Sequence, residues 1–222
     1  MCAHVDETAC GGGSEKFRRA ISHLRARFPY RKWRTHDGDF TGARYVQDPH
    51  TKEIVMHQEE FVKKMKPMRL VHGTDDDLLP LERVSEMRSV VGDGNWLCTN
   101  SRPDLSVQVS ISQSGFPRPT NRHARVAAAM ARRAKQQSDL HLCYRKIPLE
   151  HLGVFIPTDS VHKNREQGKS QGGYIVGFSD MRVQQNKKVA WSPALAELEN
   201  EAGVFRHPRI RVTGAEVCLG TR

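Results

Sequence analysis

Apolar residues recur at two different spacings along the chain. Up to about residue 138 they mostly return every three or four positions, as on one face of a helix. Beyond residue 138 they alternate with polar residues, as in strands. Helices are therefore expected to dominate before this point and paired strands after it, which indicates an α+β protein.

The first ten residues predict a β-hairpin. Two short apolar runs flank the adjacent carboxylates Asp6 and Glu7, and glycines follow at 11–13. A carboxylate at a hairpin tip is held rigidly and faces solvent. This geometry suits Mg²⁺, because the ion takes only one or two protein carboxylates and keeps several waters. An ordinary acidic turn is the alternative, since Asp is common in turns.

The next segment predicts an amphipathic helix. Ser14 is a suitable N-cap, Phe17 and Leu24 lie on one face, and Pro29 ends the helix. The opposite face is basic, and it is either a solvated surface or one that meets phosphates. Its cations are Lys16, Arg18, Arg19, Arg25 and Arg27.

A small meander of strands is expected at 31–34, 40–46 and 53–57, with turns at Asp37–Gly38 and Asp48–Pro49. A short helix over 58–65 should stop at Pro67. The polar segment over 67–81 lacks either period, so we expect a linker there.

Three further helices are predicted before residue 138. One runs from Val84 and is expected to break at Gly92–Gly94, because glycine disfavours a helix interior. A second starts at Ser101–Asp104, with Leu105, Val109 and Ser112 facing inward. A third starts at Thr120 or Asn121, and its outward cations are Arg132, Arg133 and Lys135. Strands are then expected at 140–144, 152–156, 174–178 and 189–191.

Charge and cysteine content narrow the class of partner and the compartment. The chain of 222 residues has a formal net charge of +10 and a pI of about 9.6, which favours polyanions such as nucleic acid. It shows no apolar run long enough to span a membrane and no secretory signal, so we expect a cytoplasmic or nuclear protein. Five scattered cysteines with no paired spacing indicate a reducing compartment.

A series of motifs, in one order over nearly the whole chain, resembles the reverse transcriptase and RNase H region of copia-type retrotransposon Pol polyproteins. The motifs are His4–Glu7, Arg27–Trp33, Phe40–Gly42, Met56–Lys64, Met87–Gly92, Asn95–Leu97, Ser101–Leu105, Arg132–Lys135, Thr158–Ser160 and Ser170–Tyr174. The resemblance implies the C-terminal part of a palm over 1–66, a linker and helical thumb over 67–138, and a truncated RNase H-like domain over 139–222.

For the polymerase site, the resemblance implies that Asp6 is a metal ligand beside Glu7, which replaces a second aspartate. Two Mg²⁺ ions about 4 Å apart would activate the primer hydroxyl and stabilise the leaving pyrophosphate. The partner aspartate of the family lies on an earlier strand, before Met1, so we expect the polymerase site of this chain to be incomplete.

For the nuclease site, the resemblance implies that Asp159 and Glu216 hold Mg²⁺, with Glu216 at the start of a helix. Their alternatives are a turn acid at a strand end for Asp159 and an exposed first-turn glutamate for Glu216.

Three functions remain open from the sequence. The chain is a segment of an RNA-directed DNA polymerase with RNase H, or a non-catalytic remnant that binds an RNA–DNA hybrid through phosphates, or a decayed reading frame that does not fold cooperatively. In the first case its partners are the hybrid and the rest of the polyprotein. For the second, Arg132, Arg133 and Lys135 are the expected phosphate contacts.

Overall fold

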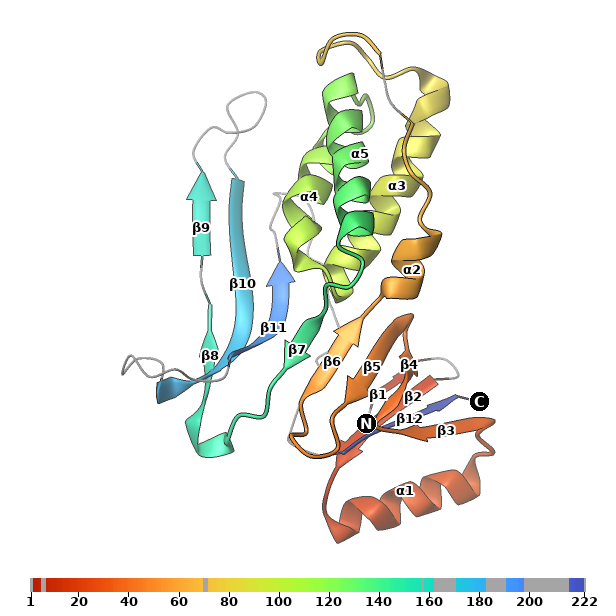
Figure 1. Ribbon diagram of the computed structural model, residues 1–222, viewed down its shortest axis with the longest axis vertical. Coiled ribbons are helices and arrows are strands. Elements are labelled where there is room, and N and C mark those ends of the chain that lie inside the picture. Colours follow the sequence, from red (N-terminus) through yellow and green to blue (C-terminus); the bar gives the residue numbers. More distant parts are fainter. Residues whose placement is uncertain are drawn as a thin grey trace.

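The computed structural model of the protein describes residues 2–4, 7–69, 72–156, 158–161, 171–182, 191–197 and 216–221. Within these residues the chain forms three antiparallel sheets and a helical bundle (Figure 1). The mixture of separate helices and antiparallel strands agrees with the expected α+β class.

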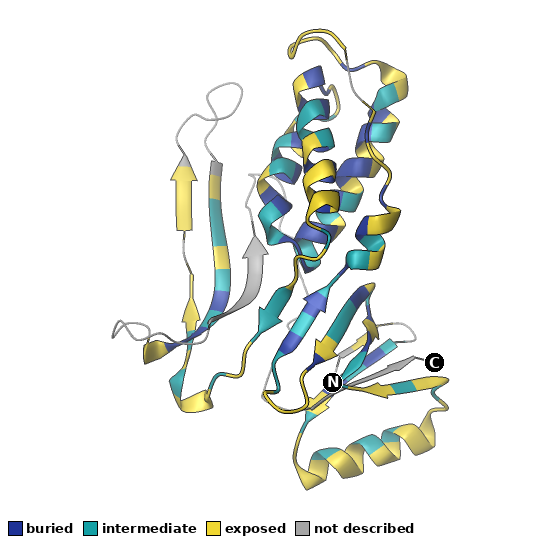
Figure 2. Cartoon of the chain, in the orientation of Figure 1, coloured by how far each residue is buried: buried dark blue, intermediate teal, exposed yellow. Residues whose placement is uncertain are grey.

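The first sheet has the strand order β1-β2-β12-β3, with β1 at Cys2–His4, β2 at Glu7–Gly12, β12 at Glu216–Thr221 and β3 at Lys32–Thr35. The predicted hairpin is present as β1 and β2, with His4 opposite Glu7. Helix α1 (Glu15–Arg27) joins β2 to β3, and the hydroxyl of Ser14 accepts a hydrogen bond from the Phe17 amide at 3.2 Å. None of the residues of α1 is fully buried (Figure 2).

Strand β12 corrects one expectation. Glu216 begins this strand and not a helix. Helix α1 connects the parallel strands β2 and β3, and these two strands are separated by a space that is one strand wide. Residues 216–221 fill that gap and pair antiparallel with both neighbours, so the backbone groups on the facing edges of β2 and β3 gain partners.

The second sheet contains β4 (Asp37–Phe40), β5 (Ala43–Gln47), β6 (Ile54–His57) and β7 (Leu142–Tyr144), in that order. The prediction of a turn at Asp37–Gly38 is wrong, because these residues are inside β4. The chain turns at Thr41–Gly42, where both residues have positive φ, 48° and 73°. Strand β7 comes from far along the sequence and pairs with β6.

The helical part consists of α2 (Glu59–Lys64), α3 (Leu81–Asn100), a 3-10 turn at Pro103–Leu105, α4 (Ser106–Ser114) and α5 (Asn121–Gln136). Leu105, Val109 and Ser112 are buried, as predicted. The apolar faces of α3, α4 and α5 meet in a hydrophobic core cluster (Figure 2).

Helix α3 runs without a break, so the expected interruption at Gly92–Gly94 is wrong. A Cβ atom on Gly94 would lie 2.3 Å from Met130 Sδ and 3.1 Å from Val109 Cγ2. The absence of a side chain therefore lets α3 pack closely against α4 and α5, and this packing outweighs the weak helix propensity of glycine.

The third sheet contains β8 (Leu152–Phe155), β9 (Thr158–Val161), β10 (Gln171–Asp180) and β11 (Trp191–Glu197), with β10 paired to the other three. A 3-10 turn at Leu149–His151 precedes it. Strand β11 lies beside β7, so the third sheet adjoins the second (Figure 1).

Candidate nucleic-acid interface

Helix α5 has one buried face and one basic face. Its buried apolar residues are small or flexible, with Ala127, Met130 and Ala134 all at 0% exposure. The helix contains no acidic residue. Its outward side chains include five cations and no anion. These cations are Arg122, Arg125, Arg132, Arg133 and Lys135, which we call the α5 basic face.

Members of the α5 basic face differ in whether a carboxylate neutralises them. Arg125 pairs with Asp75, and Arg133 lies 3.4 Å from Asp104. Arg122, Arg132 and Lys135 are exposed, and no carboxylate among the described residues pairs with them. These three cations can meet an external anion without breaking an internal ion pair. Arg132 and Lys135 are among the predicted contacts.

Sequence reasoning missed Arg122. It lies on the same face as Arg125 and Arg132, because positions three, seven and ten apart return to one side of a helix. The lack of any acidic residue on this helix, together with that spacing, was the signal that could have identified it.

The N-terminus of α5 is tied to the segment over 72–77. Asn121 Nδ2 donates to the carbonyls of His72 and Thr74 at 2.9 and 3.0 Å, and the Asn121 amide donates to the Asp77 carbonyl at 2.9 Å. Asp77 also accepts a hydrogen bond from the Thr74 amide at 2.6 Å. Acidic residues of this segment thus support the loop and its contact with α5.

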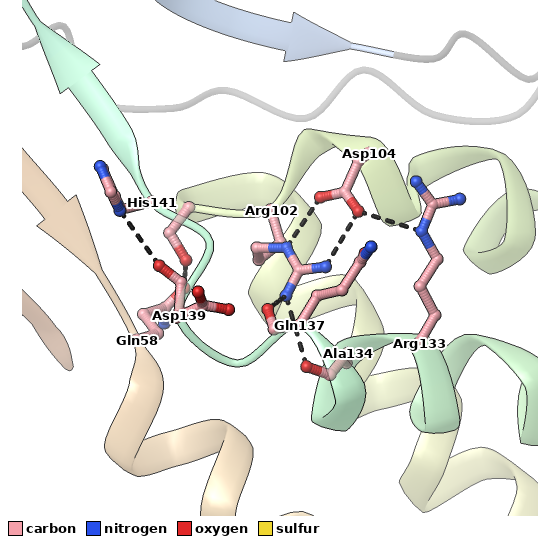
Figure 3. Close-up of polar contacts among 9 residues, drawn as sticks. Gln58, Arg102, Asp104, Arg133, Ala134, Gln137, Asp139 and His141 are labelled. Carbon is pink, nitrogen blue, oxygen red and sulfur yellow. Dashed lines mark hydrogen bonds and ion pairs between the residues drawn. The ribbon is translucent and has the colours of Figure 1, made fainter.

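The C-terminus of α5 is held by Arg102 (Figure 3). Its side chain is 2% exposed, and it donates from Nε and Nη2 to the two oxygens of Asp104 at 2.8 and 2.9 Å. Nη1 donates to the carbonyl of Gln137 at 2.8 Å, and Ala134 O lies 3.5 Å away. The Arg-Pro-Asp motif therefore joins the start of α4 to the end of α5, beside Arg133.

The hairpin carboxylates are only partly within the described residues. Asp6 lies outside them. Glu7 begins β2, and its Oε2 accepts a hydrogen bond from the backbone amide of Thr41 at 2.6 Å. One oxygen of Glu7 is therefore already engaged by the β4–β5 turn.

The two carboxylates expected for the nuclease site lie in different sheets. Asp159 is exposed within β9, opposite Gly173, and its Oδ1 accepts a hydrogen bond from the Ser160 amide at 2.8 Å. Glu216 begins β12 in the first sheet, opposite Gly12. The structure therefore does not bring Asp159 and Glu216 into one sheet (Figure 1).

Within the described part of the chain, no three side chains of His, Cys, Asp or Glu lie close enough together to hold a metal ion. Over the same residues, no helix has the length and apolar character needed to cross a membrane.

Comparisons of the chain with protein-family models, with curated proteins and with solved structures found no match. The resemblance to copia-type polyproteins thus depends on the sequence motifs alone.

Proposed function

We propose that this chain binds duplex nucleic acid through its phosphates, as part of a copia-type reverse transcriptase and RNase H. The observation that carries the proposal is the α5 basic face, which presents Arg122, Arg132 and Lys135 without carboxylate partners among the described residues. The order of a carboxylate hairpin, a small sheet and a helical bundle supports the family assignment, because it is the order expected for a palm followed by a thumb.

The α5 basic face is suited to phosphates more than to bases. Arg122 and Arg132 are ten residues apart on one helix, so their Cα atoms are about 15 Å apart along its axis. Cations spaced along a helix in this way can contact several phosphates of a duplex. Contacts of this kind set the position and affinity of a protein without reading sequence.

Among the described residues, the side chains expected to bind two metal ions are not brought together. Asp159 and Glu216 are in separate sheets, and one oxygen of Glu7 already accepts a hydrogen bond. The proposal for this chain is therefore binding of the hybrid. Assignment of Asp6, Asp159 and Glu216 to Mg²⁺ remains a hypothesis from the resemblance.

The test is a titration of a labelled RNA–DNA hybrid of mixed sequence with the purified chain, followed by fluorescence anisotropy at several salt concentrations. We expect the logarithm of the association constant to fall linearly with the logarithm of the salt concentration, with a slope of about 0.9 per phosphate contact. The association constant should be the same for hybrids of different sequence. Arg132→Ala combined with Lys135→Ala should weaken binding and reduce the slope by about 2.

Helix α1 offers a matched control. Arg18→Ala combined with Arg19→Ala removes the same charge from another exposed basic helix. An equal loss in both double variants would mean that net charge, and not the α5 basic face, determines binding. No binding, together with a non-cooperative thermal transition, would identify a decayed reading frame instead.

The same mixtures, with and without Mg²⁺, show whether the RNA strand is cut. Binding without cutting fits the non-catalytic alternative. Magnesium-dependent cutting that Asp159→Asn abolishes would instead support the nuclease assignment of this residue.

A further inference from the structure

Strand β12 brings a cysteine near the end of the chain opposite one near its beginning. It lies between β2 and β3, and its antiparallel register with β2 places Cys218 opposite Cys10. On either side, Val217 is opposite Gly11 and Leu219 is opposite Ala9. The pairing is thus continuous through the two cysteines.

The backbone geometry of this pairing meets the requirement for a disulfide. Directly opposed residues of an antiparallel pair have Cα atoms about 4.5 or 5.5 Å apart. A disulfide joins Cα atoms about 4.4 to 6.8 Å apart. Both kinds of opposed position fall inside this range, so the Cα separation expected for this register permits a cross-link between Cys10 and Cys218.

We propose that Cys10 and Cys218 form a redox-sensitive disulfide that fastens β12 between β2 and β3. This site is independent of the proposed binding of nucleic acid. The sequence alone does not predict this disulfide, because the two cysteines are far apart along the chain and their spacing matches no known disulfide or metal motif.

The bond forms by exchange with a small disulfide such as oxidised glutathione. One cysteine thiolate attacks a glutathione sulfur, the glutathione disulfide bond breaks, and one glutathione thiolate leaves. The second cysteine thiolate then attacks the mixed disulfide and expels the other glutathione. The protein loses two protons and two electrons, and the electrons reduce one glutathione disulfide to two thiols.

Burial sets the order of these events. Cys10 is only 3% exposed, so exchange with the oxidant requires local opening of the first sheet. Re-formation of the pairing between β2 and β12 then brings the second cysteine to the mixed disulfide. The pairing of strands, and not a random encounter, therefore selects Cys218 as the partner of Cys10.

The other cysteines have different surroundings. Cys98 is buried in α3, Cys143 is in β7, and Cys2 is opposite Ala9. In an unfolded chain, loop-closure entropy would instead favour a link between Cys2 and Cys10, which are close in the sequence. A bond between Cys10 and Cys218 therefore reports the docked position of β12.

The experiment treats the full chain with oxidised glutathione at neutral pH, in buffer and in concentrated urea, and maps trypsin peptides without reduction. A Cys2→Ser background removes the ambiguity between Cys2 and Cys10, which share one tryptic peptide. In buffer we expect the peptide of Cys10 linked to the peptide of Cys218, and a higher denaturation midpoint that dithiothreitol reverses. In urea this preference should be lost.

Matched variants distinguish the proposed bond from general oxidation. Cys218→Ser should abolish both the linked peptide and the rise in midpoint, whereas Cys98→Ser and Cys143→Ser should leave both unchanged. The proposal is overturned if Cys10 carries only glutathione in buffer, if it links to a different cysteine, or if the midpoint rises equally in Cys218→Ser.

Discussion

The carboxylate of Glu7 accepts a hydrogen bond from the backbone amide of Thr41 at 2.6 Å, and this contact joins the first hairpin to the β4–β5 turn. The next residue, Gly42, lies against Trp96 of α3, since a Cβ there would be 3.4 Å from Trp96 Cζ2. One turn therefore contacts the first sheet on one side and the helical bundle on the other.

The strain at this turn can be relieved by substitution. Thr41 and Gly42 both have positive φ, as a two-residue type I′ turn requires, but a β-branched residue is unfavourable in that region. We expect Thr41→Asn to raise the free energy of unfolding by about 1 kcal/mol. Gly42→Ala should lower it by a similar amount. Urea denaturation of both variants measures whether the free energy of unfolding rises or falls. A lower free energy of unfolding in Thr41→Asn would contradict this account.

The two glycines of α3 should respond in opposite directions. Gly94→Ala places a methyl group against Met130 and Val109 in the core, so we expect a loss of about 1–3 kcal/mol in unfolding free energy. Gly92→Ala meets no atom within 4 Å and should gain about 0.5–1 kcal/mol from better helix propensity. Thermal melts of both variants test this, and equal effects would mean that close packing at Gly94 is unimportant.

Arg102 should be far more important to stability than its neighbour Arg133. Arg102→Ala leaves Asp104 and the Gln137 carbonyl without their buried donor, at a cost of about 3–5 kcal/mol. Arg133→Ala removes an exposed contact at 3.4 Å and should cost less than about 1 kcal/mol. Denaturant unfolding compares the two. Arg102→Lys should recover little, because lysine cannot bind the carboxylate with two parallel hydrogen bonds.

Glu86 should make stability depend on acid pH. The Arg69 amide donates to its Oε1 at 2.9 Å, and hydrogen bonds from the Arg69 and Arg83 side chains add to this, so the pKa of Glu86 falls to about 2. The unfolded chain, with an ordinary pKa of about 4.3, binds the proton first. The stabilisation is therefore present above about pH 4.3 and is lost as pH falls towards 2.

Glu86→Gln should remove this dependence. The difference in unfolding free energy between the parent chain and the variant should be largest near pH 6 and shrink steadily down to pH 3, as measured by urea titrations. Glu82→Gln removes an exposed carboxylate from the same helix and is the control. A difference for Glu86→Gln that does not change with pH would contradict the role given to its hydrogen bonds.

Local features could be predicted from the sequence because they depend on residues only a few positions apart. The Ser14 cap, the helix start at Ser101–Asp104 and the inward positions of Leu105 and Val109 follow from capping and helical periodicity. The outward cations of α5 follow from the same period. These features account for the helices and for most of the candidate interface.

Long-range features could not be predicted, because each depends on a contact between segments that are distant in sequence. Gly94 remains helical because Met130 packs against it, and Arg102 acts as a clamp because α5 ends beside it. Likewise, Glu216 belongs to the first sheet because β2 and β3 leave room for one more strand. Periodicity identifies which residues are apolar or basic, whereas tertiary packing decides which of them meet.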